Sequence, residues 1–380
     1  MKTTIKFLLY FSFLFVASCG QPTDMLTVIN ADGSCYREFN ENADSAFLRG
    51  NTSADHNPFP TDIDSTWKLK WSYKSPVLRS DFPLSKLVYD SIYKTRVDEG
   101  RIANQKSKDD VLVYARRDYK SVAEMDSLFK FKKSLEWSKL TVKHALDMNF
   151  RWFYTYYTYK ETSSKINTGF ELPIEDFMNK DEAQFWFTGK PDILKGMNGV
   201  EARVCVEEIE GDYNRWVLHN CWNSEYKALV SYYDKMKKKP VSKEELISLG
   251  DSIFETKVKS DKDYDVEKVM NKFFKTDAFS ELWLTDNSPM KKFERDFNYG
   301  FSEFFSRSFN YKLIMPGKII KSSDAVIQGD TLVWKLTAYR MVPGDYTIEA
   351  QSRKANVWAF ILTGIMLVVA VGSFFWKRKK

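Results

Sequence analysis

The sequence contains few of the residues and none of the common motifs that catalysis uses. Its 380 residues include only three histidines and four cysteines. No HExxH, CxxC or paired His/Cys spacing occurs, so no zinc site is indicated. The chain also lacks the GxGxxG and P-loop patterns that hold phosphates and the GxSxG pattern of a serine nucleophile. We therefore expect no enzyme, no metal and no cofactor.

Net charge is also lacking once the two ends are set aside. The chain has 57 Lys and Arg against 51 Asp and Glu, a net charge of +6. Six of the basic residues are Lys2, Lys6 and the four residues 377–380, and without them the two signs balance. A neutral body gives no electrostatic basis for binding nucleic acid.

The first residues have the three parts of a secretory signal. Lys2 and Lys6 are followed by the apolar run Phe7–Val16 and by Val16-Ala17-Ser18-Cys19. This ending resembles the lipobox of bacterial lipoproteins, which implies removal of residues 1–18 and attachment of fatty acids such as palmitate to Cys19. Several acyl chains hold a protein on a membrane where one does not. The alternative is an ordinary signal peptide with an incidental cysteine.

The last residues predict a transmembrane helix. Residues 357–376 carry no charge and would rise about 30 Å as a helix, the thickness of a bilayer core. Trp358 and Trp376 stand at its two ends, where aromatic rings favour the membrane interface. The basic residues 377–380 follow, and the positive-inside rule puts them in the cytoplasm. We expect residues 19–356 to be a periplasmic ectodomain held on the inner membrane.

The two anchors are joined to this ectodomain by short tethers. Gly20–Asp24 separates the lipid from the first expected strand, and about five residues separate the last expected strand from the helix. If those two strands are neighbours in a sheet, both anchors enter the same membrane. A bridge between two membranes would need the termini at opposite poles. We expect one membrane.

The ectodomain is expected to be an α+β fold, in which N- and C-terminal strands form an antiparallel sheet and a large helical insertion lies between them. Helices are indicated by caps at Ser121, Ser242 and Ser288-Pro289 and by the amphipathic stretch Val266–Phe274. The expected strands are Met25–Asn30, Ser34–Phe39, Thr66–Lys74, Phe150–Tyr159, Glu201–Ile209, Arg215–Cys221, Tyr311–Met315, Lys318–Lys321, Thr331–Tyr339 and Asp345–Gln351.

The end of the ectodomain resembles LppM-type lipoprotein domains. The resemblance lies in Ile314-Met315-Pro316-Gly317-Lys318-Ile319-Ile320 and Gly329-Asp330-Thr331-Leu332-Val333-Trp334-Lys335-Leu336. It implies a β-rich, lipid-binding-like ectodomain with a C-terminal anchor. The long helical insertion departs from that compact pattern.

Three cysteines remain besides Cys19. If Glu201–Ile209 and Arg215–Cys221 form a hairpin centred on Tyr213, Cys205 lies directly opposite Cys221 and a disulfide can form in the oxidising periplasm. Cys35 would then stay unpaired. The alternative is that Cys205 and Cys221 are two buried free thiols.

Two further patterns could serve contact with lipid, although a structural role is the commoner explanation of each. A phenylalanine recurs every four residues and predicts an apolar ridge on a helix, which either closes a ligand cavity or packs on a solid core. The lysine-rich stretch 235–239 either contacts anionic headgroups or is a solvated helix end. The ridge residues are Phe293, Phe297, Phe301, Phe305 and Phe309.

Taken together, these features predict an envelope lipoprotein anchored to the membrane at both ends. It would be non-enzymatic and would bind lipid or a partner protein at the membrane surface. One alternative is a scaffold or assembly factor of an envelope complex. Another is an enzyme acting on envelope polymers, although no carboxylates can be singled out for that role.

Overall fold

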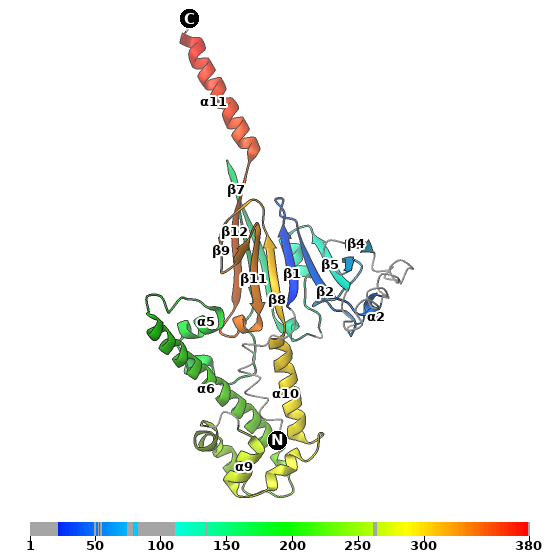
Figure 1. Cartoon of the computed structure of the whole chain (residues 1–380), viewed down its shortest axis with the longest axis vertical. Coiled ribbons are helices and arrows are strands. Elements are labelled where there is room, and N and C mark those ends of the chain that lie inside the picture. Colours follow the sequence, from blue (N-terminus) through cyan, green and yellow to red (C-terminus); the bar gives the residue numbers. More distant parts are fainter. Residues whose placement is uncertain are drawn as a thin grey trace. The chain divides into compact units, whose positions relative to one another are not determined.

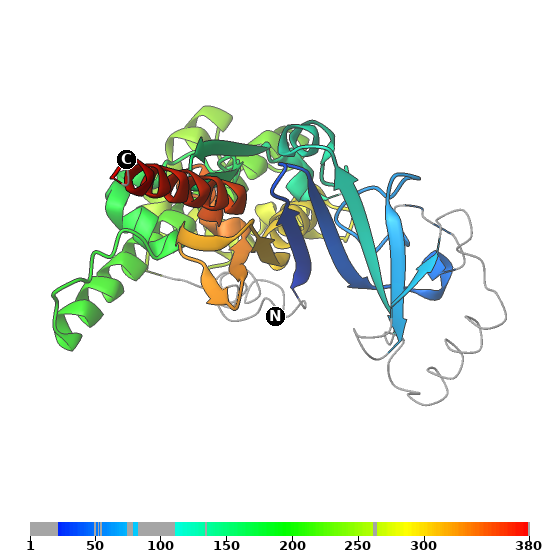
Figure 2. The ribbon, with the colours of Figure 1, turned by 90° about the horizontal axis from the view of Figure 1, so that it is seen from above.

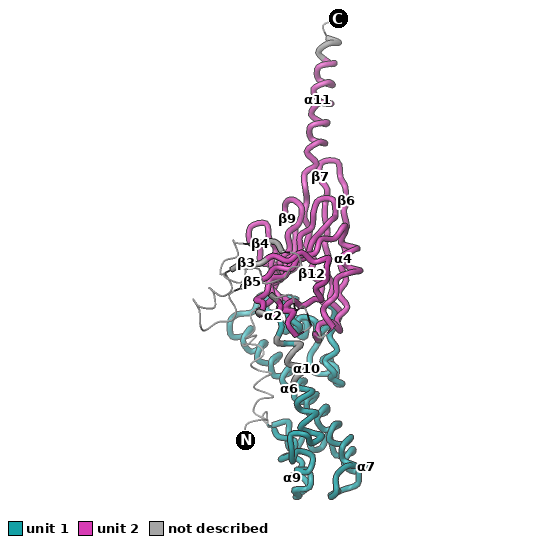
Figure 3. The backbone as a smooth tube through the Cα atoms, turned by 90° about the vertical axis from the view of Figure 1, so that its right-hand side faces the viewer, with its two compact units in different colours: residues 1–21, 165–307, 337–345 teal, residues 22–164, 308–336, 346–380 magenta. Residues whose placement is uncertain are grey.

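The computed structural model describes residues 22–48, 51, 53, 55–73, 79–82, 111–133, 135–260 and 264–378. The predicted signal peptide, Cys19 and the last two lysines lie outside these residues. The chain forms two compact units (Figure 3). The first, here called the sheet unit, comprises Pro22–Ser164, Ser308–Leu336 and Tyr346–Lys380. The second, the helical unit, comprises Lys165–Arg307 and Thr337–Asp345 of the described chain. The predicted α+β class with a large helical insertion is confirmed.

In the part of the chain that the structure describes, the sheet unit contains two β-sheets, most of whose strands are labelled in Figure 1. One has eight strands in the order β10-β11-β8-β1-β2-β5-β3-β4, and the other has four in the order β6-β7-β12-β9. Figure 2 shows β1, β2 and β5 side by side. The strands are β1 Thr23–Ile29, β2 Cys35–Asn42, β3 Lys68–Tyr73, β4 Arg79–Phe82, β5 Val111–Tyr119, β6 Val142–Arg151, β7 Tyr154–Ser163, β8 Ser308–Ile314, β9 Lys318–Ser322, β10 Val326–Gln328, β11 Thr331–Thr337 and β12 Tyr346–Ala355. Short helices α2 Ser45–Leu48, α4 Val122–Leu128 and η2 Glu136–Lys139 accompany them.

N- and C-terminal strands do meet in one sheet, as predicted. The hairpin of β1 and β2 turns at Gly33, whose φ of 85° suits glycine. On its other side β1 pairs with β8, with Thr23 opposite Phe309. This pair is parallel, whereas the sequence predicted an antiparallel sheet throughout.

The single strand predicted at Phe150–Tyr159 is wrong. The chain turns at Trp152 and Phe153, so that β6 and β7 form an antiparallel hairpin with Arg151 opposite Tyr154. Aromatic alternation continues through both strands, and no Gly, Pro or Asn marks the turn. Because the aromatic alternation continues across the turn, the sequence pattern did not indicate where the chain reverses.

The four-stranded sheet packs one face against the eight-stranded sheet. From β7, Tyr157 Oη donates to the carbonyl of Ala31 in the β1–β2 turn at 3.0 Å. The hydroxyls of Tyr159 and Tyr311, from β7 and β8, lie 3.2 Å apart. Both sheets thus share one core, in which these tyrosines are buried.

In the helical unit, α6 is the longest element and replaces the predicted second hairpin. Residues Glu201–Ile209 and Arg215–Cys221 both belong to this helix, which begins at a capping box made by Asn198 and Glu201. Its buried residues Ile209, Tyr213 and Trp216 follow helical spacing. The unit contains η3 Ile174–Asp176, α5 Lys180–Thr188, α6 Gly199–Tyr232, η4 Tyr233–Lys235, α7 Lys243–Ser248, α8 Gly250–Ile253, the π-helix η5 Phe254–Val258, α9 Val266–Phe274, η6 Ala278–Trp283, α10 Pro289–Ser306 and η7 Ala338–Met341.

The predicted helix starts are confirmed. The hydroxyl of Ser121 accepts from the amide of Glu124 at the start of α4, and Ser242 accepts from Glu245 at the start of α7. Ser288 precedes α10, with Pro289 at its first position. The local capping residues therefore predicted where these three helices begin, although the longest helix was not predicted.

Candidate functional site

Each of the three histidines has a different set of neighbours. His56 is exposed and lies 2.7 Å from Asp44, while His219 stacks on Phe254 with 4.0 Å between ring centres. Only His144 is buried. Among the described residues no group of three or more His, Cys, Asp or Glu could hold a metal ion.

The predicted disulfide is wrong. Cys205 and Cys221 both lie on α6, sixteen residues apart, which corresponds to about 24 Å along a helix. A disulfide needs the two Cα atoms within about 7 Å of each other. Both are free thiols, as is Cys35. Cys221 and Cys35 are buried and Cys205 is half-buried, so the free-thiol alternative is nearer to the structure.

The phenylalanine ridge is a core feature rather than a cavity wall. Phe293 packs against the helical core, and Phe305 contacts Tyr339 with 4.6 Å between ring centres. Phe297 stacks on Phe293 at 5.6 Å. The structure does not describe the side chain of Phe301. Phe309 is not on the helix at all, because α10 ends at Ser306 and Phe309 belongs to β8, against Trp137.

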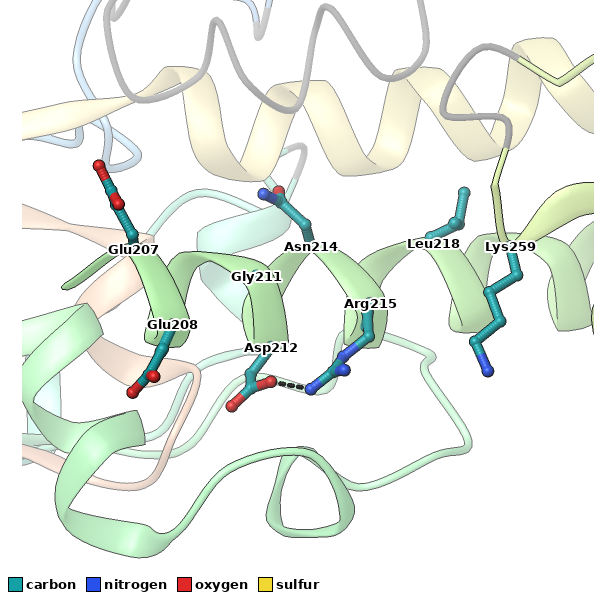
Figure 4. Close-up of a pocket in the computed structure, with 8 residues that line it drawn as sticks. All are labelled: Glu207, Glu208, Gly211, Asp212, Asn214, Arg215, Leu218 and Lys259. Atoms are coloured by element: carbon teal, nitrogen blue, oxygen red, sulfur yellow. Dashed lines mark hydrogen bonds and ion pairs between the residues drawn. The ribbon is translucent and has the colours of Figure 1, made fainter. Parts of the chain in front are cut away.

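A groove runs along α6, and Figure 4 shows its side chains. It has a volume of about 570 Å³. Its acidic groups lie toward one end and its basic groups toward the other, and Asp212 is paired with Arg215. Three acidic and two basic side chains line this groove. The groove is lined by Glu207, Glu208, Gly211, Asp212, Asn214, Arg215, Leu218 and Lys259.

The most informative feature of the sheet unit is the junction between its four-stranded sheet and the final helix, α11 Val357–Arg378. Only Asn356 separates β12 from α11, instead of the five residues expected. Its backbone N–H donates to Phe153 O at 2.9 Å. Its side-chain amide donates to the carbonyls of Arg151 and Trp152 at 2.9 and 3.2 Å and accepts from the Thr155 hydroxyl at 3.0 Å. One side chain thus ties the β6–β7 turn to the start of the helix.

Aromatic contacts extend this junction along α11. Trp152 Nε1 donates to the hydroxyl of Thr363 at 2.8 Å, and the rings of Trp152 and Trp358 lie 5.3 Å apart, edge to face. Phe153 packs on Phe360 at 4.7 Å. Both side chains of the turn remain largely exposed, although they are large and apolar. The helix itself is long and apolar enough to cross a membrane and is almost wholly exposed.

A second unusual feature of the sheet unit is a charged cluster between its two sheets. Arg37 on β2 is fully buried and lies 2.6 Å from Glu161 on β7. Tyr159 and Tyr311 each donate to the same carboxylate oxygen at 2.8 Å. His144 on β6 has Nε2 3.2 Å from Arg37 and Nδ1 3.1 Å from Asp126, which is partly exposed.

Electrostatics explain why this cluster stays charged. Burial alone would raise the pKa of Glu161, but Arg37, His144 and the two tyrosine hydroxyls outweigh burial and hold it below its usual value. Burial, together with Arg37, lowers the pKa of His144, although Glu161 and Asp126 oppose this. The guanidinium of Arg37 also lies 4.5 Å from the Phe129 ring. The cluster is therefore a buried ion pair with satisfied hydrogen bonds.

The strand directions bear on the two predicted anchors. β1 runs parallel to β8, and just after β8 Ser352 Oγ of β12 donates to Pro316 O at 2.8 Å. The start of β1 at Thr23 is therefore at the opposite end of the strands from α11, about 30 Å from Asn356 at roughly 3.3 Å per residue. The chain from Cys19 to Thr23 reaches at most about 14 Å.

The first and last strands are not neighbours either. β1 lies in the eight-stranded sheet and β12 in the four-stranded sheet. The expectation that both anchors enter one membrane rested on these strands being adjacent. That premise is wrong.

With the geometry described, the chain can be set beside known proteins. No family model matches it, and no curated protein or solved structure does. The lipobox and the LppM-type resemblance therefore stay predictions from the sequence. Asn356 and the β6–β7 turn were not predicted from the sequence, and no pattern indicated the Arg37 cluster, whose ion pair joins residues 124 apart in sequence. The one sequence feature that could have indicated the junction was the single Asn just before the apolar run.

Proposed function

We propose that this chain is a non-enzymatic, membrane-anchored envelope protein that holds its sheet unit rigidly on the bilayer and binds lipid at the membrane surface. The supporting observation is the junction at Asn356, where the tip of the β6–β7 hairpin is tied to α11. A flexible tether would leave the sheets free to tumble. A one-residue link with four hydrogen bonds does not.

The hairpin tip has the chemistry of a membrane interface. Thr363 lies six residues beyond Val357, about 9 Å along the helix, so its bond to Trp152 places that indole beside the first turns of the apolar segment. Tryptophan favours this level of a bilayer because its ring is apolar and its N–H is polar. The exposed Phe150 and Phe153 add apolar surface on the same tip.

The remaining parts of the proposal come from the sequence. Residues 1–18 would direct export, Cys19 would carry fatty acids, and the basic tail 377–380 would stay in the cytoplasm, leaving the two units in the periplasm. Replacing Cys19 with Ser should abolish incorporation of a palmitate analogue in growing cells. Incorporation that survives the change would remove the lipid anchor from the proposal.

Fluorescence can test the membrane-facing tip. The full chain is reconstituted into vesicles of bromine-labelled lipid, which quench tryptophans in the bilayer. Trp152→Phe should remove part of the quenched emission, whereas Trp216→Phe, buried in the helical unit, should remove only unquenched emission. Equal loss in both variants would contradict the proposed position of the tip.

The scaffold alternative is favoured by one separate observation in the helical unit. The start of α6 exposes Val200 and Val204, with Met197 just before it, and Val200 is 74% exposed. Isolated apolar residues are common on surfaces, but these follow helical spacing. A photo-crosslinking residue at position 204 should capture one discrete envelope protein if the scaffold function holds. Diffuse or absent crosslinks would favour the lipid-binding function.

A further inference from the structure

Three basic side chains lie at the membrane end of the four-stranded sheet without an acidic partner. Arg151 ends β6, Lys318 begins β9, and Arg353 is near the end of β12. All three are exposed. None forms an ion pair with a residue that the structure describes, whereas Lys160, farther up the same sheet, pairs with Glu349 at 3.1 Å.

The strand register puts these three cations on one face of the sheet. Arg353 is directly opposite Lys318 on one side and Tyr156 on the other. Arg151 is directly opposite Tyr154. Opposed residues project from the same face, and so do residues two apart on a strand. The resulting row crosses the strands in the order Arg151, two tyrosines, Arg353, Lys318, on the face away from the buried core.

The two tyrosines hold the arginines in place. The Arg151 guanidinium lies 4.8 Å from the centre of the Tyr156 ring, and that of Arg353 lies 4.9 Å from the Tyr154 ring. A guanidinium stacked on a ring keeps its N–H edges free, and those edges match the paired oxygens of a phosphate. The stacking therefore orders the arginines before any ligand arrives.

The height of the row matches lipid headgroups. Arg353 precedes Asn356 by three residues, about 10 Å of extended chain, and the apolar helix begins at the next residue. The polar layer on each side of a bilayer core is about 5–8 Å thick. Long basic side chains reach across the difference. The acidic residues of this face stand farther from the membrane, as Glu349 does on β12.

We propose that Arg151, Arg353 and Lys318, which we call the basic row, bind the phosphate of anionic lipid headgroups. This inference rests on the proposed membrane anchoring and names the lipid class that the anchored sheet recognises. The row supplies three positive charges and two preordered guanidinium groups to a negatively charged surface. Zwitterionic headgroups would gain less, because their own ammonium opposes the row.

The test uses the full chain in a neutral detergent and counts bound lipids by native mass spectrometry. The probes are phosphatidylglycerol and phosphatidylcholine. The triple variant Arg151→Gln, Lys318→Gln, Arg353→Gln should bind phosphatidylglycerol at least tenfold more weakly and phosphatidylcholine unchanged. The matched control is Lys237→Gln, Lys238→Gln, Lys239→Gln, which removes the same charge from the lysine stretch of the helical unit and should bind as the parent does.

Three outcomes would overturn the inference. One is unchanged phosphatidylglycerol binding in the triple variant, and another is equal loss in the control. The third is full displacement of the lipid by millimolar inorganic phosphate, which would indicate a site for free anions. Alkaline carbonate extraction of membranes separates this inference from the proposed function: release of the parent chain would refute anchoring itself, whereas retention with unchanged lipid binding would refute only the basic row.

Discussion

Each unit of the molecule buries a glutamate, and the two carboxyl groups differ in their partners and in their pKa. In the sheet unit, Glu161 meets Arg37 at 2.6 Å, and its pKa is held below the usual value. In the helical unit, Glu225 on α6 accepts from the hydroxyl of Tyr264, a neutral partner, and no cation among the described residues pairs with it. Burial, reinforced by Glu294 and Asp265, raises the pKa of Glu225 to about 8.

The difference shows that burial alone does not decide the charge of an acid. A cation at hydrogen-bond distance offsets the free energy that a carboxylate loses when it leaves water, whereas a neutral phenol does not. At neutral pH Glu161 is therefore an anion and Glu225 is mostly protonated. The sheet unit depends on an ion pair, and the helical unit depends on the proton of one carboxyl group.

Breaking the ion pair should have the largest effect. Glu161→Gln leaves Arg37 buried without a counter-charge, which costs about 3–5 kcal/mol in proteins. Peptide-resolved hydrogen exchange should show β2 and β7 opening more often by a corresponding factor. Glu349→Gln, which breaks the more exposed pair with Lys160, should cost under about 1 kcal/mol. Equal protection in both variants would mean that the pair does not hold the two sheets together.

Removing the ionisable group from the helical unit should have a smaller effect and the opposite sign. The folded pKa of Glu225, about 8, lies above the ordinary 4.5, so its stabilising contribution is complete below pH 4.5 and is lost as the pH rises through 8. The loss is about 1.4 kcal/mol per pH unit, or roughly 3 kcal/mol by pH 7.

Glu225→Gln should therefore match the parent near pH 4 and exceed its stability by roughly 3 kcal/mol at pH 7. Hydrogen exchange of α6, corrected for intrinsic rates, measures this. Glu210→Gln, exposed on the same helix, should keep the slope of the parent. A parent whose α6 protection does not change between pH 5 and pH 8 would show that Glu225 is ionised throughout.

The smallest expected effect is a change in thiol labelling rates, which can be measured for both units in one experiment. Cys35 is buried in the sheet unit and Cys221 in the helical unit, one turn before Glu225, while Cys205 is half-buried. At pH 7 Cys205 should react first. Above pH 8, ionised Glu225 should loosen α6, and Cys221 should react several-fold faster relative to Cys35 after correction for thiolate content. A constant ratio of the two rates would argue against separate pH responses.

Local signals in the sequence predicted several individual elements of the fold. The Asp-Gly turn, the serine caps and the proline at the start of α10 specify their elements through bonds within a few residues, and all formed as expected. The α6 region was wrongly predicted as a hairpin, because its alternating valines are typical of a strand and Gly211-Asp212 is typical of a turn. In the structure Gly211 is mid-helix, where glycine costs only about 1 kcal/mol and packing outweighs it.

The charged cluster of the sheet unit was harder to predict because it depends on long-range pairing. Arg37, His144 and Glu161 meet only once two sheets have packed, and no spacing in the sequence relates them. The basic row likewise needs the register of four strands. By contrast, the apolar α11 and its flanking aromatic residues could be read directly, since a membrane span depends on composition alone.

Under the proposed anchoring, the single residue between β12 and α11 couples the orientation of a membrane helix to that of the sheets. Membrane helices tilt as the bilayer thickens or thins, by angles of about 10–20°. Because Asn356 transmits the tilt to the sheets, a change of about 10° would swing the start of β1, about 30 Å away, sideways by about 5 Å. A small adjustment within the bilayer would thus become a displacement the size of a side chain at the far end of the sheet unit.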